Sequence, residues 1–311
     1  MSVCVVACVV VTSVSMMAQK GPDQLTRARQ AYNAQQFDEA IVLATAARSA
    51  PALADSASLV MARALLERFR RGGDVTDVAT AREALLSVES ARVTASETRE
   101  LRLGMAELLF VDEQYGAAAE VFEAALDWPQ VSGSDHVRDR LLEWWASSLD
   151  RYAQLAHDSE RPLRYRRLLT RLELEVTRGV SSPVVTYWLA AAARGADDPD
   201  RAWSLAIAGW VQAPLIAAEA QAAVLRTDLD RLMREAIIPE RARRTWSAIA
   251  PAANPAIDIA ARQRSLEAEW EVLKKRWGSA EVGTWGGGFN GVGVRPSSRL
   301  CRRAGRRTRD S

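Results

Sequence analysis

Two stretches of this chain, 78 residues apart, repeat the same spacing of aromatic, small and proline residues. Each has an aromatic residue after a short polar turn, an alanine three positions later, a second alanine seven positions after the first, and a proline four positions beyond. The members are Phe37, Ala40, Ala47 and Pro51 in the first stretch, and Tyr115, Ala118, Ala125 and Pro129 in the second. Similarity at a fixed spacing is typical of chains built from repeated supersecondary units.

The chain between residues 23 and 277 has a helical hydrophobic period and few β-branched runs, and Ala, Leu, Arg and Glu dominate it. Proline and glycine interrupt this period at intervals that leave room for helices of about 12–20 residues. The interrupting residues are Pro51, Gly72, Gly73, Pro129, Gly133, Pro162, Gly179, Pro183, Pro199, Pro214, Pro239, Pro251 and Pro255. We therefore expect an all-α fold of consecutive helical hairpins.

Small residues recur where the two helices of each hairpin would touch, because such helices approach closely only at Ala or Gly. In the first, third and late units these positions, with the aromatics and prolines around them, are Ala28, Ala40, Ala47 and Pro51; Ala106, Tyr115, Ala118, Phe122, Ala125 and Pro129; and Trp188, Leu189, Ala190, Ala202, Ala206, Gly209 and Pro214. The pattern resembles the tetratricopeptide repeat family. The resemblance implies a right-handed solenoid of antiparallel helical hairpins, a superhelix like that of the family.

Two parts of the chain depart from this pattern. In the second unit Ala62 fits, but a longer loop over residues 68–78 precedes Ala81. The segment 135–178 is irregular, with two longer helices around Pro162. We expect three hairpins over 19–130, and further hairpins over 131–277 that end in two capping helices, Glu219–Ala236 and Ile257–Trp277.

The two ends of the chain have a different character. An apolar run, Val3–Val14, and a cut point after Ala18 predict a signal peptide over 1–18 and hence a periplasmic or otherwise extracytoplasmic protein. The alternative is an anchor in the membrane through the N-terminus, by an uncleaved segment or a lipid on Cys8. Residues 278–311, rich in Gly and Arg, predict a disordered tail.

Charge is distributed unevenly. The net charge is +2, but residues 295–311 contain seven Arg and one Asp. The remaining residues carry 34 basic and 38 acidic side chains, a net charge of −4. A mildly acidic body argues against a nucleic-acid partner, whereas the arginine-rich tail could contact an anionic surface of the envelope.

The residues of common active sites and metal sites are missing from the sequence. His136 and His157 lack the spacing of a zinc helix, and neither a Gly-x-Ser-x-Gly elbow nor a phosphate-binding loop occurs. The three cysteines, Cys4, Cys8 and Cys301, all lie near the ends. We therefore predict no catalytic residue, no metal site and no cofactor.

Two groups of side chains allow a structural and a functional interpretation. A basic stretch predicts a solvated helix face above inward-facing leucines, or else a docking patch for anionic glycan, lipid headgroups or an acidic partner. Five tryptophans on predicted helices indicate core packing, or else an aromatic groove for peptide or sugar. The basic residues are Arg161, Arg164, Arg166, Arg167 and Arg171; the leucines are Leu163, Leu168, Leu169 and Leu172; the tryptophans are Trp144, Trp145, Trp188, Trp203 and Trp210.

The tetratricopeptide resemblance also implies where a partner binds, because these arrays use the concave wall formed by the first helix of each hairpin. The matching positions are Arg29, Tyr32, Asn33, Arg63, Glu67, Glu107, Phe110, Tyr187 and Arg194. Their mixture of charged and aromatic groups suits an extended peptide. We therefore expect a non-catalytic interaction scaffold of the bacterial cell envelope that binds a protein or peptide. The alternatives are a helical enzyme acting on cell-wall glycan and a purely structural envelope component.

Overall fold

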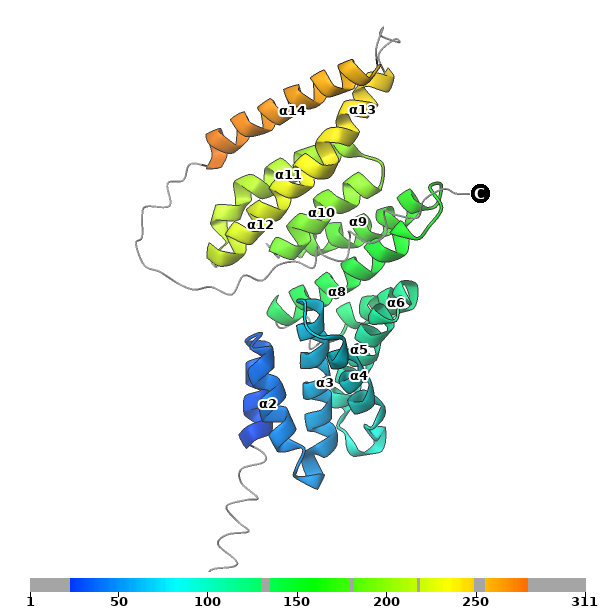
Figure 1. Cartoon of the computed structure of the whole chain (residues 1–311), viewed down its shortest axis with the longest axis vertical. Coiled ribbons are helices and arrows are strands. Elements are labelled where there is room, and N and C mark those ends of the chain that lie inside the picture. The colour runs from blue at the N-terminus through cyan, green and yellow to red at the C-terminus, as the bar shows by residue number, and fades with distance from the viewer. Residues whose placement is uncertain (1–22, 130–134, 179–181, 217–218, 249–254, 279–311) are drawn as a thin grey trace, which may run out of the picture. The chain divides into compact units, whose positions relative to one another are not determined.

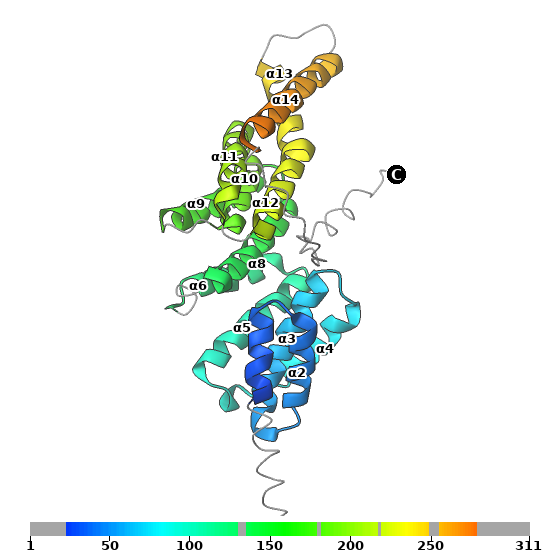
Figure 2. The same ribbon diagram turned by 90° about the vertical axis from the view of Figure 1, so that its left-hand side faces the viewer.

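The computed structural model describes residues 23–129, 135–178, 182–216, 219–248 and 255–278. All regular structure in these ranges is helical, and no strand occurs among them (Figures 1 and 2), which confirms the predicted all-α fold. The predicted signal peptide, the three cysteines and the glycine- and arginine-rich tail beyond Gly278 lie outside the described residues. The helices form two compact units that divide after Val131, and each is described by itself.

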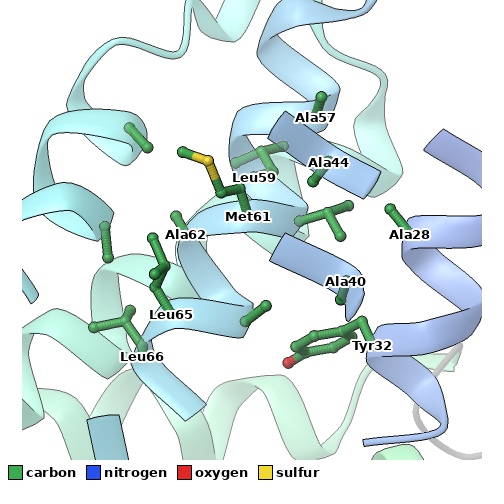
Figure 3. Packing of buried hydrophobic residues seen from close by; sticks show 14 of the residues in the cluster. Ala28, Tyr32, Ala40, Ala44, Ala57, Leu59, Met61, Ala62, Leu65 and Leu66 are labelled. Carbon is green, nitrogen blue, oxygen red and sulfur yellow. The ribbon is translucent and has the colours of Figure 1, made fainter. Parts of the chain in front are cut away.

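The first unit consists of three helical hairpins. Its helices are the one over residues 23–33, α2 (Phe37–Ala47), α3 (Ala54–Arg70), α4 (Val75–Leu86), α5 (Ala95–Val111) and α6 (Tyr115–Leu126), with short 3-10 turns at Pro51–Leu53 and Ser90–Arg92. Helix α3 is central, because it packs against α2, α4 and α5. Alanines line the contacts around it: Figure 3 shows Ala28 on helix 23–33, Ala40 and Ala44 on α2, and Ala57 and Ala62 on α3.

The second unit continues with longer helices. These are α8 (Asp135–Gln154), α9 (Arg161–Thr177), α10 (Pro183–Gly195), α11 (Pro199–Gln212), α12 (Glu219–Leu232), α13 (Ile238–Ala248) and α14 (Pro255–Gly278). Helix α10 occupies the place that α3 has in the first unit, because it packs against α8, α9, α11 and α12. Helix α5 in the first unit and helix α10 in the second therefore each contact their own partner and both helices of the hairpin before them.

The end of this unit differs from the prediction. Helix α12 does not end before Pro239 but passes through a π-helical turn, Met233–Ile237, directly into α13. In that turn the N–H of Ile238 donates to the carbonyl of Met233, five residues back. Such a widened turn changes the backbone pairing just where proline lacks an N–H and its ring would clash with the preceding turn. Pro239 therefore lies inside a continuous helical segment.

Four hairpins share one turn conformation, which we call the shared turn. In each, one residue has a positive φ, its N–H donates to the carbonyl three residues back, and the next N–H donates to the carbonyl five residues back, over 2.8–3.1 Å. This is the Schellman arrangement that ends many helices. The residues with positive φ are Gln35, Gly72, Glu113 and Asp197, with φ of 62°, 105°, 62° and 65°.

The shared turn fixes the positions of the small residues. A fully buried alanine lies seven residues before the positive-φ residue, and another lies five residues after it, in three of the four hairpins. These are Ala28 and Ala40, Ala106 and Ala118, and Ala190 and Ala202. The α3–α4 hairpin has Leu65 at the first of these positions, and its turn is one residue longer before α4 begins. The second unit of the predicted pattern is thus the one that departs from it.

Tryptophans pack inside the second unit. Trp144 and Trp145 on α8 and Trp270 on α14 are among the largest fully buried side chains, and Trp188 and Trp203 are also buried. The ring of Trp270 lies between two rings of α11, with centroids 6.4 Å from Trp203 and 5.2 Å from Trp210. The core interpretation of Trp144, Trp145, Trp188 and Trp203 is therefore confirmed.

A buried ion pair joins the first two helices of the second unit. Arg138 on α8 donates from Nε and Nη2 to the two carboxylate oxygens of Glu175 on α9, both over 2.6 Å, and both side chains are buried.

Within the part of the chain that the structure describes, none of the helices is both long and apolar enough to cross a membrane.

Candidate functional site

The partner-binding residues predicted in the first unit lie on helix 23–33, α3 and α5, the first helices of their hairpins. Four of them are buried: Tyr32, Glu67, Glu107 and Phe110. Their surroundings explain this burial, since the rings of Tyr32 and Phe110 pack against the aromatic that begins the next helix. The centroid distances are 5.8 Å for Tyr32 and Phe37, and 5.2 Å for Phe110 and Tyr115.

The charged members of this set pair with one another. Arg63 on α3 donates from Nε and Nη2 to Oε1 of Glu107 on α5, over 3.2 and 2.8 Å. The guanidinium of Arg63 also lies 5.2 Å from the ring centroid of Tyr32. Three of the predicted groove residues thus form one internal cluster that links helix 23–33, α3 and α5.

A second ion pair spans the same helices. Arg29 donates to Glu97 at the start of α5 over 2.6 Å, and Glu97 closes a capping box with Thr94. Burial alone would raise the pKa of Glu97, but hydrogen bonds from Ser56, Thr94 and Arg29 lower it to about 2.

Most of the residues predicted to bind a partner in the first unit therefore have internal contacts. Tyr32, Glu67, Glu107 and Phe110 are packing residues in this structure, and Arg63 is committed to Glu107. Of the seven residues predicted there, Asn33 is exposed and Arg29 is partly exposed beside Glu97. The sequence places these side chains on the first helix of each hairpin, as predicted. It does not show that side chains of neighbouring hairpins pair with them or pack against them.

The second unit presents a different surface. Tyr187 and Arg194 lie seven residues apart on α10, so they share one face of that helix, and both are half-buried. Glu143 and Asp150 have the same spacing on α8, which packs against α10 on one side, while Asp228 lies on α12, which packs against it on the other. The charges of all three carboxylates act on the hydroxyl of Tyr187.

Hydrogen bonds hold these carboxylates in place. The indole Nε1 of Trp188 donates to Glu143 over 2.9 Å, and the hydroxyl of Tyr165 on α9 donates to Asp150 over 2.5 Å. Arg231, one turn beyond Asp228 on α12, donates to that aspartate over 2.7 Å. Side chains from α8, α9, α10 and α12 therefore fix the polar groups on this surface.

Close packing beneath it depends on glycine. A Cβ atom built on Gly195, at the end of α10, would lie 2.4 Å from the ring of Tyr165. Only glycine lets α9 and α10 come this close. The hydroxyl of Tyr165 on α9 can then reach Asp150 on α8.

We call Glu143, Asp150, Tyr187, Arg194, Asp228 and Arg231 the α10 face. Burial, together with the nearby charge of Glu143, raises the pKa of Asp228 to about 6, although Arg231 opposes this rise. Burial also raises the pKa of Asp150, although the bond from Tyr165 counteracts it, and burial together with Asp228 raises the pKa of Tyr187. The α10 face therefore carries carboxylates whose ionisation costs free energy.

The two arginines of the α10 face are already engaged. Arg194 donates from Nε and Nη2 to Glu240 on α13, over 2.9 and 2.6 Å, and Arg231 binds Asp228. A positive charge brought in from outside would thus meet more carboxylate than guanidinium near Tyr187. Carboxylates beside an aromatic ring are groups that bind ammonium and guanidinium ions.

The sequence analysis named Tyr187 and Arg194 but not the carboxylates beside them. The pairs Glu143–Asp150 and Tyr187–Arg194 share a seven-residue spacing, so polar residues on the packed side of α8 were the available signal. Among the described residues, no three His, Cys, Asp or Glu side chains are grouped to hold a metal ion. His157 is exposed, and the side chain of His136 lies outside the described residues.

No protein-family model matches the chain, and no curated protein or solved structure matches it either.

Proposed function

We propose that this protein is a non-catalytic interaction scaffold whose α10 face binds an extended, positively charged segment of a protein or peptide. The observation that carries the proposal is the gathering of Glu143, Asp150 and Asp228 around Tyr187, with the pKa of Asp228 raised to about 6. Carboxylates that ionise at a cost on a partly open face favour a cationic ligand, because its charge recovers part of that cost.

The tetratricopeptide-like interpretation is part of this proposal. Its support is the shared turn, the buried alanines at fixed offsets from it, and the same pattern of helix contacts around α3 and α10. In such an array the first helices of successive hairpins, here α8, α10 and α12, form the wall that receives a ligand. The α10 face lies on these three helices.

The two units would then have different roles. In the first unit, the equivalent side chains are joined in the Arg63–Glu107 and Arg29–Glu97 pairs, which leave few groups for a partner. In the second, carboxylates outnumber the arginines that face them. We therefore place peptide binding on the second unit.

A binding assay with simple charged peptides tests the proposal. Fluorescence anisotropy should show that a labelled peptide of alternating alanine and arginine binds the full-length protein, whereas the alanine–glutamate counterpart does not. The double substitution Glu143→Gln with Asp228→Asn should weaken binding about tenfold, since it removes two charges that face the ligand. Far-UV circular dichroism should show unchanged helicity.

A matched control distinguishes the loss of a specific binding site from a general effect of the protein's net charge. Glu39→Gln with Glu89→Gln removes two exposed carboxylates from the first unit and should leave affinity unchanged. Equal weakening by both double substitutions, or equal binding of both peptides, would refute a specific site on α10.

Export to the cell envelope stays a proposal that rests on the apolar run Val3–Val14 and the small residue Ala18. N-terminal sequencing of the protein isolated from its own cells should find a chain that begins at Gln19. A chain that retains the first 18 residues in the cytoplasm would contradict export with cleavage.

A second candidate function is cleavage of cell-wall glycan, and one observation favours it. Asp228, buried with a pKa of about 6, lies near Glu143, and a carboxyl whose pKa is raised toward neutral pH can act as a general acid. Incubation with peptidoglycan should then release soluble fragments, and Asp228→Asn should abolish that release. Intact peptidoglycan after prolonged incubation would exclude this reaction.

A further inference from the structure

The outward side of α9 carries leucines and arginines together. Leu163 and Leu174 are eleven residues apart, which is three helical turns, so they lie on one line along the helix, about 16 Å apart. Their exposed fractions are 59% and 46%. Arg166 and Arg167 lie between them and are exposed. Leu168, Leu169 and Leu172 are buried as predicted, whereas Leu163 points outward, contrary to the prediction.

The turn before α9 also exposes a leucine. Leu155, just after α8, is 71% exposed. Arg164 holds the turn against the start of α9, because its guanidinium lies 3.6 Å from the ring centroid of Tyr152 and donates to the carbonyl of that residue over 2.6 Å. We call Leu155, Leu163, Arg166, Arg167 and Leu174 the α9 outer face.

Charge on this helix is strongly positive in a body that is otherwise acidic. Residues 161–178 contain six arginines and two glutamates, whereas the whole chain without its last 17 residues has a net charge of −4. Both glutamates are engaged: Glu175 is buried against Arg138, Arg171 and Arg178, and Glu173 pairs with Arg201 of α11. Residues 161–178 therefore carry a net charge of +4.

We propose that the α9 outer face binds an anionic lipid surface, such as the headgroup layer of a membrane rich in phosphatidylglycerol. Exposed leucines beside exposed arginines let one face combine burial of apolar side chains with electrostatic attraction to anionic headgroups. The leucines enter the boundary between headgroups and acyl chains, and the arginines bind lipid phosphates. This proposal uses a different surface from the α10 face and does not depend on peptide binding.

A fluid lipid layer fits this surface better than an acidic protein segment does. The face lies along the outer side of one helix, and its apolar side chains are separated by three helical turns. A protein partner would need a complementary shape over that length, whereas lipid headgroups rearrange around each side chain. Several basic residues near an anionic membrane each add to binding within about 10 Å, the Debye length at moderate salt.

Sedimentation with vesicles tests the proposal. Full-length protein should pellet with vesicles of equal parts phosphatidylcholine and phosphatidylglycerol, and not with phosphatidylcholine alone. Raising the salt from about 0.05 M to about 0.5 M should release most of it. Arg166→Glu with Arg167→Glu should lower the vesicle partition coefficient about tenfold or more, and Leu163→Ser with Leu174→Ser should lower it severalfold.

Two control variants match these changes elsewhere on the chain. Val42→Ser with Leu86→Ser removes side chains that are 68% and 69% exposed, and Arg27→Glu with Arg102→Glu reverses two exposed charges; both pairs lie in the first unit. Neither should reduce binding by more than about twofold, apart from the general effect of net charge. Circular dichroism checks that every variant is folded.

Three results would overturn the proposal. They are no sedimentation of the wild-type protein with anionic vesicles at low salt, equal loss in the α9 variants and their controls, and equal binding to neutral vesicles. If the wild-type protein did not bind vesicles but bound a poly-glutamate peptide through Arg166 and Arg167, the α9 outer face would instead be a binding site for an acidic protein segment.

Discussion

Arg63 on α3 donates two hydrogen bonds, of 2.8 and 3.2 Å, to one carboxylate oxygen of Glu107 on α5. The two residues are 44 positions apart, and Glu107 is completely buried. A buried carboxylate must be paired to remain ionised, so this contact fixes how the second and third hairpins stack. Residues that the repeat pattern assigns to a binding wall therefore serve as a joint between neighbouring repeats.

Arg63→Ala should destabilise the first unit by about 3 kcal/mol or more, because it leaves a buried carboxylate without this guanidinium. Hydrogen exchange of peptides from α3 and α5 reports that loss directly. Arg82→Ala is the matched control, since Arg82 and Asp112 form an exposed pair. Its cost should stay below about 1 kcal/mol. Similar protection in the two variants would show that the buried pair does not hold the hairpins together.

The shared turn predicts opposite effects for two adjacent glutamines. Gln35 has a φ of 62°, a region that costs L-residues about 1–2 kcal/mol, whereas Gln36 has a φ of −88°. Gln35→Gly should therefore stabilise the first unit by about 0.5–1 kcal/mol, and Gln36→Gly should destabilise it slightly. Thermal unfolding of both variants measures the difference. A lower melting temperature for Gln35→Gly would contradict the turn.

Gly195→Ala should destabilise the second unit although alanine is the better helix former. Propensity favours alanine by about 1 kcal/mol, but the new methyl group would lie 2.4 Å from the ring of Tyr165. Overpacking of this kind costs about 1–3 kcal/mol, so the net effect is a loss. Urea unfolding followed by tryptophan fluorescence measures it. In the background Tyr165→Ala the same substitution should become neutral or favourable, and an unchanged cost would place the strain elsewhere.

Asp228 predicts a stability that falls as pH rises. Burial, with Glu143 nearby, raises its folded-state pKa from 3.8 to about 6. Between these values the folded protein keeps a proton that the unfolded chain has released, so this contribution is present below about pH 4 and lost above about pH 6. Asp228→Asn should raise the stability of the second unit at pH 7.5 by of the order of 2 kcal/mol and change little at pH 4. An equal effect at both pH values would contradict the raised pKa.

Local signals were sufficient for the helices and their pairing. Alanine at Ala28, Ala40, Ala106 and Ala118 marks the close contacts because only small side chains fit there, and all four are fully buried. The proline signal was less dependable: Pro183 and Pro199 begin helices, whereas Pro239 lies within one. A proline restricts only its own turn, and the π-helical turn at Met233–Ile237 relieves that restriction.

The order of apolar, small and helix-breaking residues by itself determined that this chain folds into helical hairpins, because periodicity and turn chemistry act over a few neighbouring residues. Only the tertiary structure decided which charged side chains pair with one another inside the fold and which lie on a partly exposed face. Arg63 meets Glu107 across 44 residues, and Asp228 comes to Tyr187 and Glu143 from helices that are distant in the sequence. Burial and charge at such places depend on how the helices stack, so the acidic α10 face could not be found from the sequence alone.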